Sequence, residues 1–336
     1  MARVVCFDLF HARLCDLLYF PLPVTRACHP YRKYPLGPRN MASTTTLSSS
    51  QPSTSEPQLN VQYCAPGFCL PHPDTVNQFC RDQSNLIFCQ GVIIVKISPE
   101  VVVKFGAHIN ITEAKTMIHV AQSTGVPVPK VFAYYTYGPI DRDAGDYGGL
   151  YDTYIFMSFV AGETLHTAWD TFDVSTKSHI SRQLASYIQE IRDMGNVGYI
   201  GSIDHGPVTD HSLSTSIDKG PFDSEQDFNT ALINTYQKNA PKRHITSFLS
   251  GMLPQSHRIL FTHGDIRPQN VMVKDGNVVA IIDWELSGWY PEYWEFAKAL
   301  LTWGWQSDWT DYLMQILQPY HAEFFMHSFL MEKLLI

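Results

Sequence analysis

The feature that most constrains this chain is the stretch HGDIRPQN, which runs from His263 to Asn270 and is followed by Asp283 thirteen residues after Asn270. Residues 275–277, Asp-Gly-Asn, lie between two runs rich in β-branched residues, NVMVK and VVAIID. An Asp-Gly step in this setting predicts a tight β-hairpin. Because the hairpin folds the intervening residues back on themselves, we expect Asn270 and Asp283 to converge.

Oxygen-bearing side chains at these positions match the needs of phosphoryl transfer. That reaction uses a carboxylate that orients the attacking hydroxyl, oxygen ligands for magnesium, and positive charge on the nucleotide phosphates. Asp265 fits the first need, and Asn270 and Asp283 offer hard oxygen ligands. The structural alternative is that His263 is a core histidine and Asp265 a helix cap. We disfavour it because H-G-D-x4-N arises by chance on the order of once per thousand chains of this length.

The first half of the globular sequence predicts β-structure around one helix. Residues 86–106 contain three strand-like runs, and a helix is expected over 113–124 with Thr112 as its cap. Two further strands are expected over 130–138 and 152–160. Strands in this order, joined by short turns, indicate a small antiparallel lobe.

The second half is mainly helical. Apolar residues recur at helical spacing over 175–195, and helical patterns return near 224–250 and after 309. We therefore predict an α+β fold with two lobes. Residues 61–157 form the small β-rich lobe with one helix, and residues 158–336 form a larger, mainly helical lobe that carries the motif.

Residues 1–60 differ in composition from the rest. Ten of the thirteen residues in 43–55 are Ser or Thr, a composition that cannot bury a core. Asp8 and Asp16 interrupt the apolar runs that a signal peptide needs. We expect this segment to be a disordered arm or a mispredicted extension, with Met41 as a natural start.

The positions of the cysteines and the net charge indicate the compartment and limit the kinds of partner that this protein can have. All seven cysteines lie in the first 89 residues, which indicates reduced thiols of an intracellular, cytoplasmic protein rather than a disulfide framework. A zinc site is conceivable but poorly spaced over Cys64, Cys69, His72 and Cys80. The net charge of −8 and the lack of 18 consecutive apolar residues predict no nucleic-acid partner and no membrane span. We expect a monomer.

The segments THGDIRPQNVMV and AIIDWE resemble the aminoglycoside phosphotransferase family of the protein-kinase-like superfamily, especially its fungal branch. The segments VVVKFG, GVPVPKVFAYY and FMSFVAGETL are also similar to family segments, so the resemblance covers roughly residues 85–310. It implies a protein-kinase-like, two-lobed fold that binds ATP and Mg²⁺. It further implies transfer of the γ-phosphoryl group to a hydroxyl of a small-molecule acceptor.

The resemblance assigns roles to the matched residues of the motif. Asp265 would act as the catalytic carboxylate, and Asn270 and Asp283 would bind the metal. Arg267 would contact the transferring phosphoryl group, and the alternative for it is a surface arginine or an ion pair with Glu285. Farther along the chain, Glu295 could support the catalytic loop, and Trp303, Trp305 and Trp309 could line a substrate pocket.

The resemblance also assigns nucleotide-binding residues. Lys104 would hold the α- and β-phosphates, and Glu113 would fix Lys104. Without the resemblance, the simpler interpretation of Lys104 is a solvated charge on a strand. For Glu113 it is an acidic residue that favours the first turn of a helix. The backbone that would bind adenine belongs to Met157, Ser158 and Val160. The phosphate-covering loop has one glycine, Gly91, where the family is rich in glycine or serine. This departure keeps open a catalytically silent, kinase-fold binding protein as the alternative function.

Overall fold

The computed structural model describes residues 56–142, 149–195, 197–239, 243–253, 256–301 and 307–334. They fall into two compact units, which we call the N-terminal and the C-terminal unit. With the gaps just given, the described part of the N-terminal unit lies within residues 56–109 and 132–156, and that of the C-terminal unit within residues 110–131 and 157–334. The expectation of a disordered arm falls mostly on residues 1–55, which lie outside the described residues.

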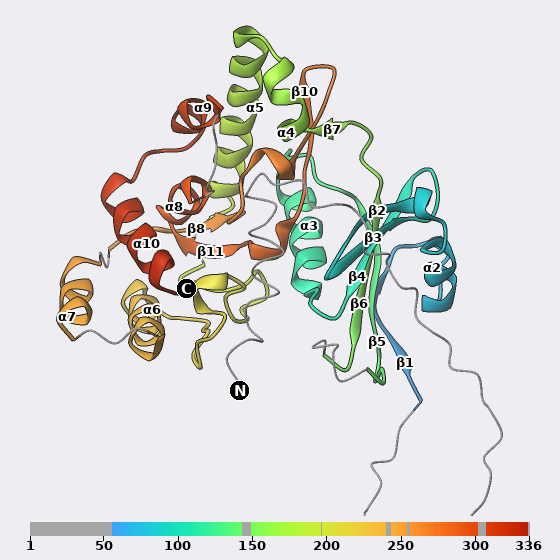
Figure 1. Cartoon of the computed structure of the whole chain (residues 1–336), viewed down its shortest axis with the longest axis horizontal. Helices are drawn as coiled ribbons and strands as arrows, with labels where there is room; N and C mark the ends of the chain where they lie inside the picture. Colours follow the sequence, from blue (N-terminus) through green and yellow to red (C-terminus); the bar gives the residue numbers. More distant parts are fainter. Residues whose placement is uncertain are drawn as a thin grey trace, which may run out of the picture. The chain divides into compact units, whose positions relative to one another are not determined.

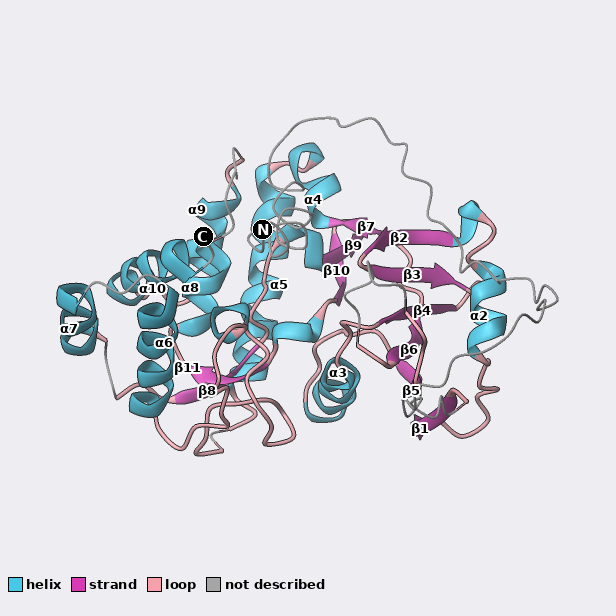
Figure 2. Cartoon of the chain, turned by 60° about the horizontal axis from the view of Figure 1, so that its bottom comes forward, coloured by secondary structure: helices cyan, strands magenta, loops and turns pink. Residues whose placement is uncertain are grey.

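The N-terminal unit contains one six-stranded sheet with the strand order β1-β5-β6-β4-β3-β2 (Figures 1 and 2). Its elements are β1 (Gln58–Cys64), α2 (Pro73–Phe79), β2 (Leu86–Gln90), β3 (Val92–Lys96), β4 (Val101–Gly106), β5 (Val131–Gly138) and β6 (Asp152–Ser158). The pairs β1–β5, β2–β3 and β3–β4 are antiparallel. The sheet buries an apolar core that includes Val103, Phe105, Tyr135 and Phe156. The β-rich part predicted from the sequence is therefore confirmed.

Strand β1 was not predicted. It begins at Gln58, before the expected start of the lobe at residue 61, and pairs with β5 from Gln58 opposite Gly138 to Cys64 opposite Ala133. Its sequence, QLNVQYC, mixes polar and apolar residues, and most of its side chains are exposed at the edge of the sheet. An edge strand of this composition has no strong alternating pattern, so hydrophobic periodicity does not predict it.

The C-terminal unit holds most of the helices (Figure 1). Its helices are α3 (Ile111–Ser123), α4 (Leu165–Ala168), α5 (Val174–Arg192), α6 (Glu225–Asn239), α7 (Arg243–Met252), α8 (Trp294–Leu300), α9 (Trp309–Ile316) and α10 (His321–Leu334). Its strands are β7 (Glu163–Thr164), β8 (Ile259–Thr262), β9 (Val271–Lys274), β10 (Asn277–Ile281) and β11 (Gly288–Pro291). Among the described residues, no helix is both long and apolar enough to cross a membrane.

Helix α3 groups with the C-terminal unit, although the sequence placed it in the β-rich lobe. Buried side chains explain the difference, because Ser287 Oγ donates a hydrogen bond to Thr116 Oγ1 over 3.1 Å. After the helix, Pro127 O accepts a hydrogen bond of 2.8 Å from the backbone N–H of Ile281 in β10. Contacts between residues so far apart in the chain leave no trace in the local pattern.

The start of α3 also differs from the expectation. Asn110, not Thr112, is the N-cap, and its side-chain oxygen accepts from the Thr112 N–H at 3.0 Å and from the Thr112 hydroxyl at 2.8 Å. Asn and Thr both favour this position, so composition alone does not separate them. The extended backbone of Asn110, at φ −98° and ψ 133°, decides the matter and leaves Thr112 in the first turn.

The predicted hairpin is confirmed. Lys274 of β9 pairs with Asn277 of β10, which leaves the two-residue turn Asp275-Gly276. Both turn residues have positive φ, 50° and 73°, as a type I′ turn requires. The hairpin joins β7 in a three-stranded sheet, and β8 pairs with β11 in a second, two-stranded sheet.

Two other expectations need correction. Trp309 is fully buried and packs edge-on against Trp169 at 5.1 Å, so it has a packing role, while Trp303 and Trp305 lie outside the described residues. Cys64, Cys69 and Cys80 are free thiols, but Cys89 is disulfide-bonded, so the expectation of reduced thiols is wrong at that residue.

Candidate active site

The motif HGDIRPQN forms the connection from β8 to β9 and ends in a short 3₁₀ helix, η4 (Pro268–Asn270). Gly264 makes this path possible because its φ is +83° and a Cβ there would lie 2.7 Å from the backbone oxygen of Leu286. No other residue type combines this conformation with such a close approach. The loop therefore passes directly over the segment that follows Asp283.

Glu295 of α8 supports this loop from inside the unit, as the sequence suggested. Its Oε2 accepts the His263 N–H at 2.7 Å, and its Oε1 accepts the Gly264 N–H at 3.1 Å. The side chain is buried, and burial raises the pKa of Glu295 to about 7 while the two N–H donors oppose that shift. A single carboxylate thus fixes two consecutive peptide groups just before Asp265.

His263 is a buried scaffold residue, as the structural alternative supposed. Its Nε2 lies 3.1 Å from the carbonyl oxygen of Ile282, and its Nδ1 accepts the Asp265 N–H at 3.1 Å. A carbonyl can only accept, so Nε2 carries the proton. Burial lowers the pKa of His263 to about 4, which keeps the ring neutral. The histidine therefore ties the backbone of Asp265 to the residue that precedes Asp283.

Asp265 is held by two neighbours from its own loop. Its Oδ2 accepts a hydrogen bond of 2.7 Å from Asn270 Nδ2 and lies 3.1 Å from Arg267 Nε. Burial raises the pKa of Asp265 to about 6; the positive charge of Arg267 opposes this shift and the negative charge of Asp283 adds to it. The side chain keeps 24% of its surface exposed, so the carboxylate stays accessible. Arg267 pairs with Asp265, and the expected alternative partner was Glu285.

Asn270 lies where the hairpin argument places it. Its Nδ2 donates both to Asp265 Oδ2 and to the backbone oxygen of Asp265, at 2.7 Å and 2.9 Å. Because the amide nitrogen makes both of these bonds, the amide oxygen Oδ1 is the atom of Asn270 that could act as a metal ligand. The backbone oxygen of Asn270 accepts the N–H of Ile282 at 2.9 Å, so Asn270 adjoins the residue before Asp283.

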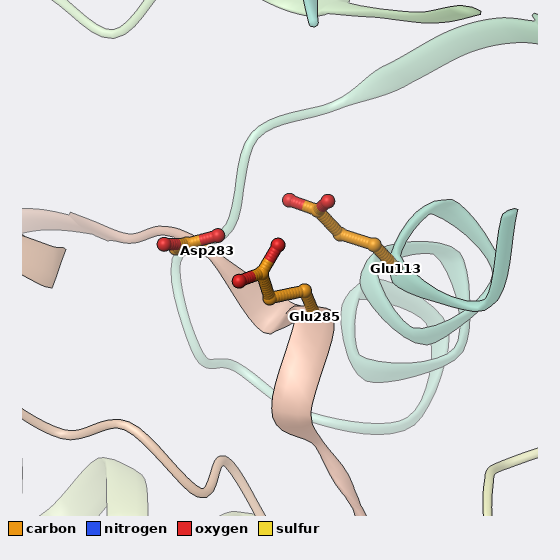
Figure 3. A group of neighbouring side chains, drawn as sticks. All are labelled: Glu113, Asp283 and Glu285. Atoms are coloured by element: carbon orange, nitrogen blue, oxygen red, sulfur yellow. The ribbon is translucent and has the colours of Figure 1, made fainter. Parts of the chain in front are cut away.

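Three carboxylates gather beyond the end of β10 (Figure 3). They belong to Glu113 of α3, to Asp283, and to Glu285 of the 3₁₀ helix η5 (Trp284–Leu286), and their ligand atoms all lie within 4.8 Å of one another. Asp283 has the left-handed backbone conformation, with φ 64°, which few residues other than glycine adopt. Hard oxygen donors of this kind suit Mg²⁺, so the donor set fits the metal that the family resemblance implies.

Sequence reasoning did not identify Glu285 as a candidate ligand. The available signal was the spacing Asp283-x-Glu285 around Trp284. Trp284 is fully buried, and its Nε1 donates to the backbone oxygen of Ile281 at 2.9 Å. This anchor fixes the short helix from which Glu285 projects toward Asp283 and Glu113 (Figure 3).

Two of the expected nucleotide-binding residues belong to the N-terminal unit. Lys104 lies on β4 opposite Ile94 of β3 and is only 5% exposed, so it is not a solvated strand charge. Gly91 is the residue between β2 and β3, where Gln90 pairs with Val92. The turn that would cover the phosphates is therefore as short as its sequence suggested.

In the segment expected to bind adenine, some backbone and side-chain groups already form hydrogen bonds within the protein. The N–H of Ser158 donates to the backbone oxygen of Lys130 at 2.9 Å, and Ser158 Oγ accepts the N–H of Lys130 at 2.9 Å. These bonds remove one backbone donor, the Ser158 N–H, from residues 157–160. Met157 is buried and Val160 is half-buried.

The sequence matches the phosphotransferase enzyme family over residues 90–329, and the chain belongs to this family. Its fold is the kinase-like fold, with an antiparallel sheet in the N-terminal unit and mainly helices in the C-terminal unit. No curated protein matches the sequence.

Several solved structures are similar to the chain. A thermostable mutant of aminoglycoside phosphotransferase APH(4)-Ia in its apo form is 15% identical, with 78% of this chain and 87% of that chain covered and a TM-score of 0.48. The streptomycin–ATP–APH(2″)-IIa ternary complex is 10% identical, with 76% and 86% covered and a TM-score of 0.47. ADP-bound APH(2″)-Ib is 11% identical, with 73% and 80% covered and a TM-score of 0.47.

Proposed function

We propose that the protein is an ATP- and Mg²⁺-dependent phosphotransferase that moves the γ-phosphoryl group to a hydroxyl of a small molecule. The observation that carries this proposal is the environment of Asp265. Its carboxylate is half-buried, accepts a hydrogen bond from Asn270, forms an ion pair with Arg267, and is fixed through its backbone by His263. A carboxylate held in this way beside a group of metal-binding oxygens is what phosphoryl transfer to a hydroxyl requires.

In the proposed reaction, Asp265 accepts a hydrogen bond from the acceptor hydroxyl and orients its oxygen toward the γ-phosphorus. The new oxygen–phosphorus bond forms as the bond from the γ-phosphorus to the β–γ bridging oxygen breaks, and ADP leaves. The hydroxyl proton passes to Asp265, whose pKa of about 6 keeps the carboxylate ionised at neutral pH and lets it release the proton to water. Arg267 contributes positive charge beside the transferring group.

The metal supplies charge neutralisation on the nucleotide phosphates when it is bound. In the C-terminal unit, Asp283 would hold it together with Asn270 Oδ1. Lys104 would hold the α- and β-phosphates, with Glu113 fixing the lysine and the backbone at Gly91 covering the phosphates. The backbone of Met157 and Val160 would bind adenine, whereas the Ser158 N–H is already bonded to Lys130.

The second candidate function is a catalytically silent binding protein of kinase fold. The observation that favours it is the turn between β2 and β3, in which Gly91 alone separates paired residues. So short a turn offers few backbone N–H groups to phosphate. We further propose, from the sequence, a monomeric and cytoplasmic protein of the fungal branch of the family.

Calorimetric titration with ATP, with and without Mg²⁺, tests the function. We expect the wild type to bind ATP in the presence of Mg²⁺, and Asp283→Ala to bind the Mg–ATP complex more weakly because a residue that would hold the metal is lost. Acceptor-dependent release of ADP, screened over a panel of hydroxyl-bearing metabolites, then separates an enzyme from a silent binder. A wild-type protein that binds no nucleotide with Mg²⁺ present rules out the phosphotransferase.

A further inference from the structure

The long connection between α5 and α6, residues 198–224, is tied to the strand β11 by backbone hydrogen bonds. The N–H of Gly201 donates to the backbone oxygen of Trp289 at 3.1 Å, and the N–H of Trp289 donates to the backbone oxygen of Gly201 at 2.8 Å. Within the connection, Ile200 and Phe222 exchange two hydrogen bonds of 2.8 Å. A segment fixed in this way can hold a side chain in a defined place inside the unit.

Asp210, on this connection, has a side chain with no exposed surface. Its Oδ1 accepts the N–H of Ser212 at 2.8 Å, and its Oδ2 lies 3.0 Å from Lys298 Nζ and accepts a hydrogen bond of 3.3 Å from Trp294 Nε1. Burial raises the pKa of Asp210, but the positive charge of Lys298 and the Ser212 N–H bring it below its usual range. Asp210 is therefore an ionised carboxylate that depends on these partners.

The two side-chain partners of Asp210 both belong to α8. Trp294 and Lys298 are four residues apart, so they lie on one face of the helix, about one turn from each other. Two bonds at this spacing to a single carboxylate restrain the rotation of α8 and its position along its axis. Glu295 follows Trp294 directly, and its two oxygens accept the N–H groups of the two residues before Asp265, at 2.7 Å and 3.1 Å. The helix therefore links Asp210 to the loop that carries Asp265.

The ion pair between Asp210 and Lys298 suits orientation better than stabilisation. A buried ion pair often adds no more stability than apolar side chains of the same volume, but it holds its partner atoms at defined distances. We propose that Asp210 is a positioning residue for Asp265, which acts by fixing α8 and, through Glu295, the loop that precedes Asp265. The inference rests on the proposed function, because Asp265 is the carboxylate that would orient the acceptor hydroxyl. A displacement of about 1 Å can lower a rate by about 10²-fold, so a residue buried away from nucleotide and acceptor can still limit turnover.

The first test compares Asp210→Asn with the wild type in the full-length protein. Asparagine keeps the shape of the side chain and an oxygen for the Ser212 N–H, but it loses the charge that pairs with Lys298. We expect acceptor-dependent ADP release to slow by about tenfold to 10²-fold, while the KM for ATP and the calorimetric affinity for Mg–ATP stay at the wild-type values. Lys298 keeps its positive charge, which also acts on Asp265, so a missing lysine cannot explain the slower rate. Wild-type turnover in Asp210→Asn overturns the proposal.

A double variant and a matched control separate positioning from stability. Asp210→Asn combined with Lys298→Met removes both charges, so the melting temperature should recover while turnover stays low. Leu249→Ala, on α7, removes a fully buried side chain whose core neighbours lie on α6, α7 and α10. It should lower the melting temperature and leave turnover unchanged. If the double variant regains wild-type turnover, or if Leu249→Ala slows turnover as much as Asp210→Asn does, the ion pair only stabilises the fold and the proposal is overturned.

Amide hydrogen exchange reports the position of the loop without any acceptor. In Asp210→Asn, the peptides that cover residues 263–265 should exchange faster, because Glu295 holds two of their N–H groups, while the peptides of α7 exchange as in the wild type. Unchanged exchange over residues 263–265 overturns the proposal. This measurement needs neither nucleotide nor acceptor. It therefore decides the role of Asp210 even if the wild type releases no ADP with any acceptor, a result that would contradict the proposed function instead.

Discussion

Asp265 gains its chemical character from residues that do not themselves react. His263 fixes its backbone N–H at 3.1 Å, Asn270 binds its carboxylate at 2.7 Å, and Glu295 holds the two peptide groups before it. Burial favours the protonated carboxyl, while the positive charge of the Arg267 guanidinium favours the carboxylate. The balance leaves a group that is ionised at neutral pH and still able to take a proton.

Asp265→Asn should lower the rate of acceptor-dependent ADP release by roughly 10²–10⁴-fold, the range expected for losing a general base. Binding of Mg–ATP should stay nearly intact, because in the proposed function Asp265 orients only the acceptor, whereas the metal would be held by Asp283. The measurement pairs the turnover rate with a calorimetric ATP titration of the same variant. An Asp265→Asn protein with unchanged turnover would assign the base to another residue.

The sequence predicted which residues belong to the site, but it did not predict all of the contacts between their side chains. The spacing from His263 to Asn270 indicated Asp265 and Asn270 together, and the two side chains are bonded. Nothing in the sequence showed that Arg267 would pair with Asp265 instead of Glu285. That choice depends on how the loop bends over the segment after Asp283, a tertiary contact made possible at Gly264.

Among the elements, those with strong local signals were predicted and those held by distant contacts were not. The β9–β10 hairpin could be predicted from the sequence, because the positive φ angles of its turn are favoured by just two residues, Asp275 and Gly276. The grouping of α3 with the C-terminal unit depends on Ser287, which is 171 residues away from its partner Thr116. Local patterns carry no information about such pairs.

The start of α3 offers a test of element stability. Asn110→Ala should lower the free energy of unfolding by about 1 kcal/mol, within the range of 0.5–2 kcal/mol measured for lost N-caps. Asn110→Asp keeps an oxygen at the cap and adds a charge that favours a helix N-terminus, so it should retain the wild-type stability. Urea unfolding of the three proteins gives the comparison. Equal stabilities for Asn110→Ala and the wild type would show that Thr112 takes over the cap.

At the scale of the whole molecule, the stability of the C-terminal unit depends on pH through buried groups of opposite kinds. Histidines with lowered pKa, His263 and His327, resist protonation in the folded state. Carboxyls with raised pKa, Asp265 and Glu295, take up protons more readily in the folded state than in the unfolded chain. As the pH falls below neutral, the first pair destabilises the fold and the second pair stabilises it.

His327 of α10 isolates one of these contributions. It is only 3% exposed, its ring lies 4.4 Å from that of Trp294, and burial, reinforced by the charge of Lys298, lowers its pKa to about 3. Well above pH 6.5 the histidine is neutral in both states and contributes nothing. Between pH 6.5 and about 3 only the unfolded chain binds the proton, so the fold loses stability as the pH falls.

The prediction is a difference between two unfolding curves. His327→Gln lacks the titrating ring, so the other buried groups contribute equally to both proteins and cancel. Relative to this variant, the wild type should lose about 2 kcal/mol in free energy of unfolding between pH 6.5 and pH 5, at about 1.4 kcal/mol per pH unit. Urea unfolding at four pH values measures the slope. Parallel curves would mean that His327 becomes protonated inside the fold, with Asp210, which opposes the pKa shift, as its counter-charge.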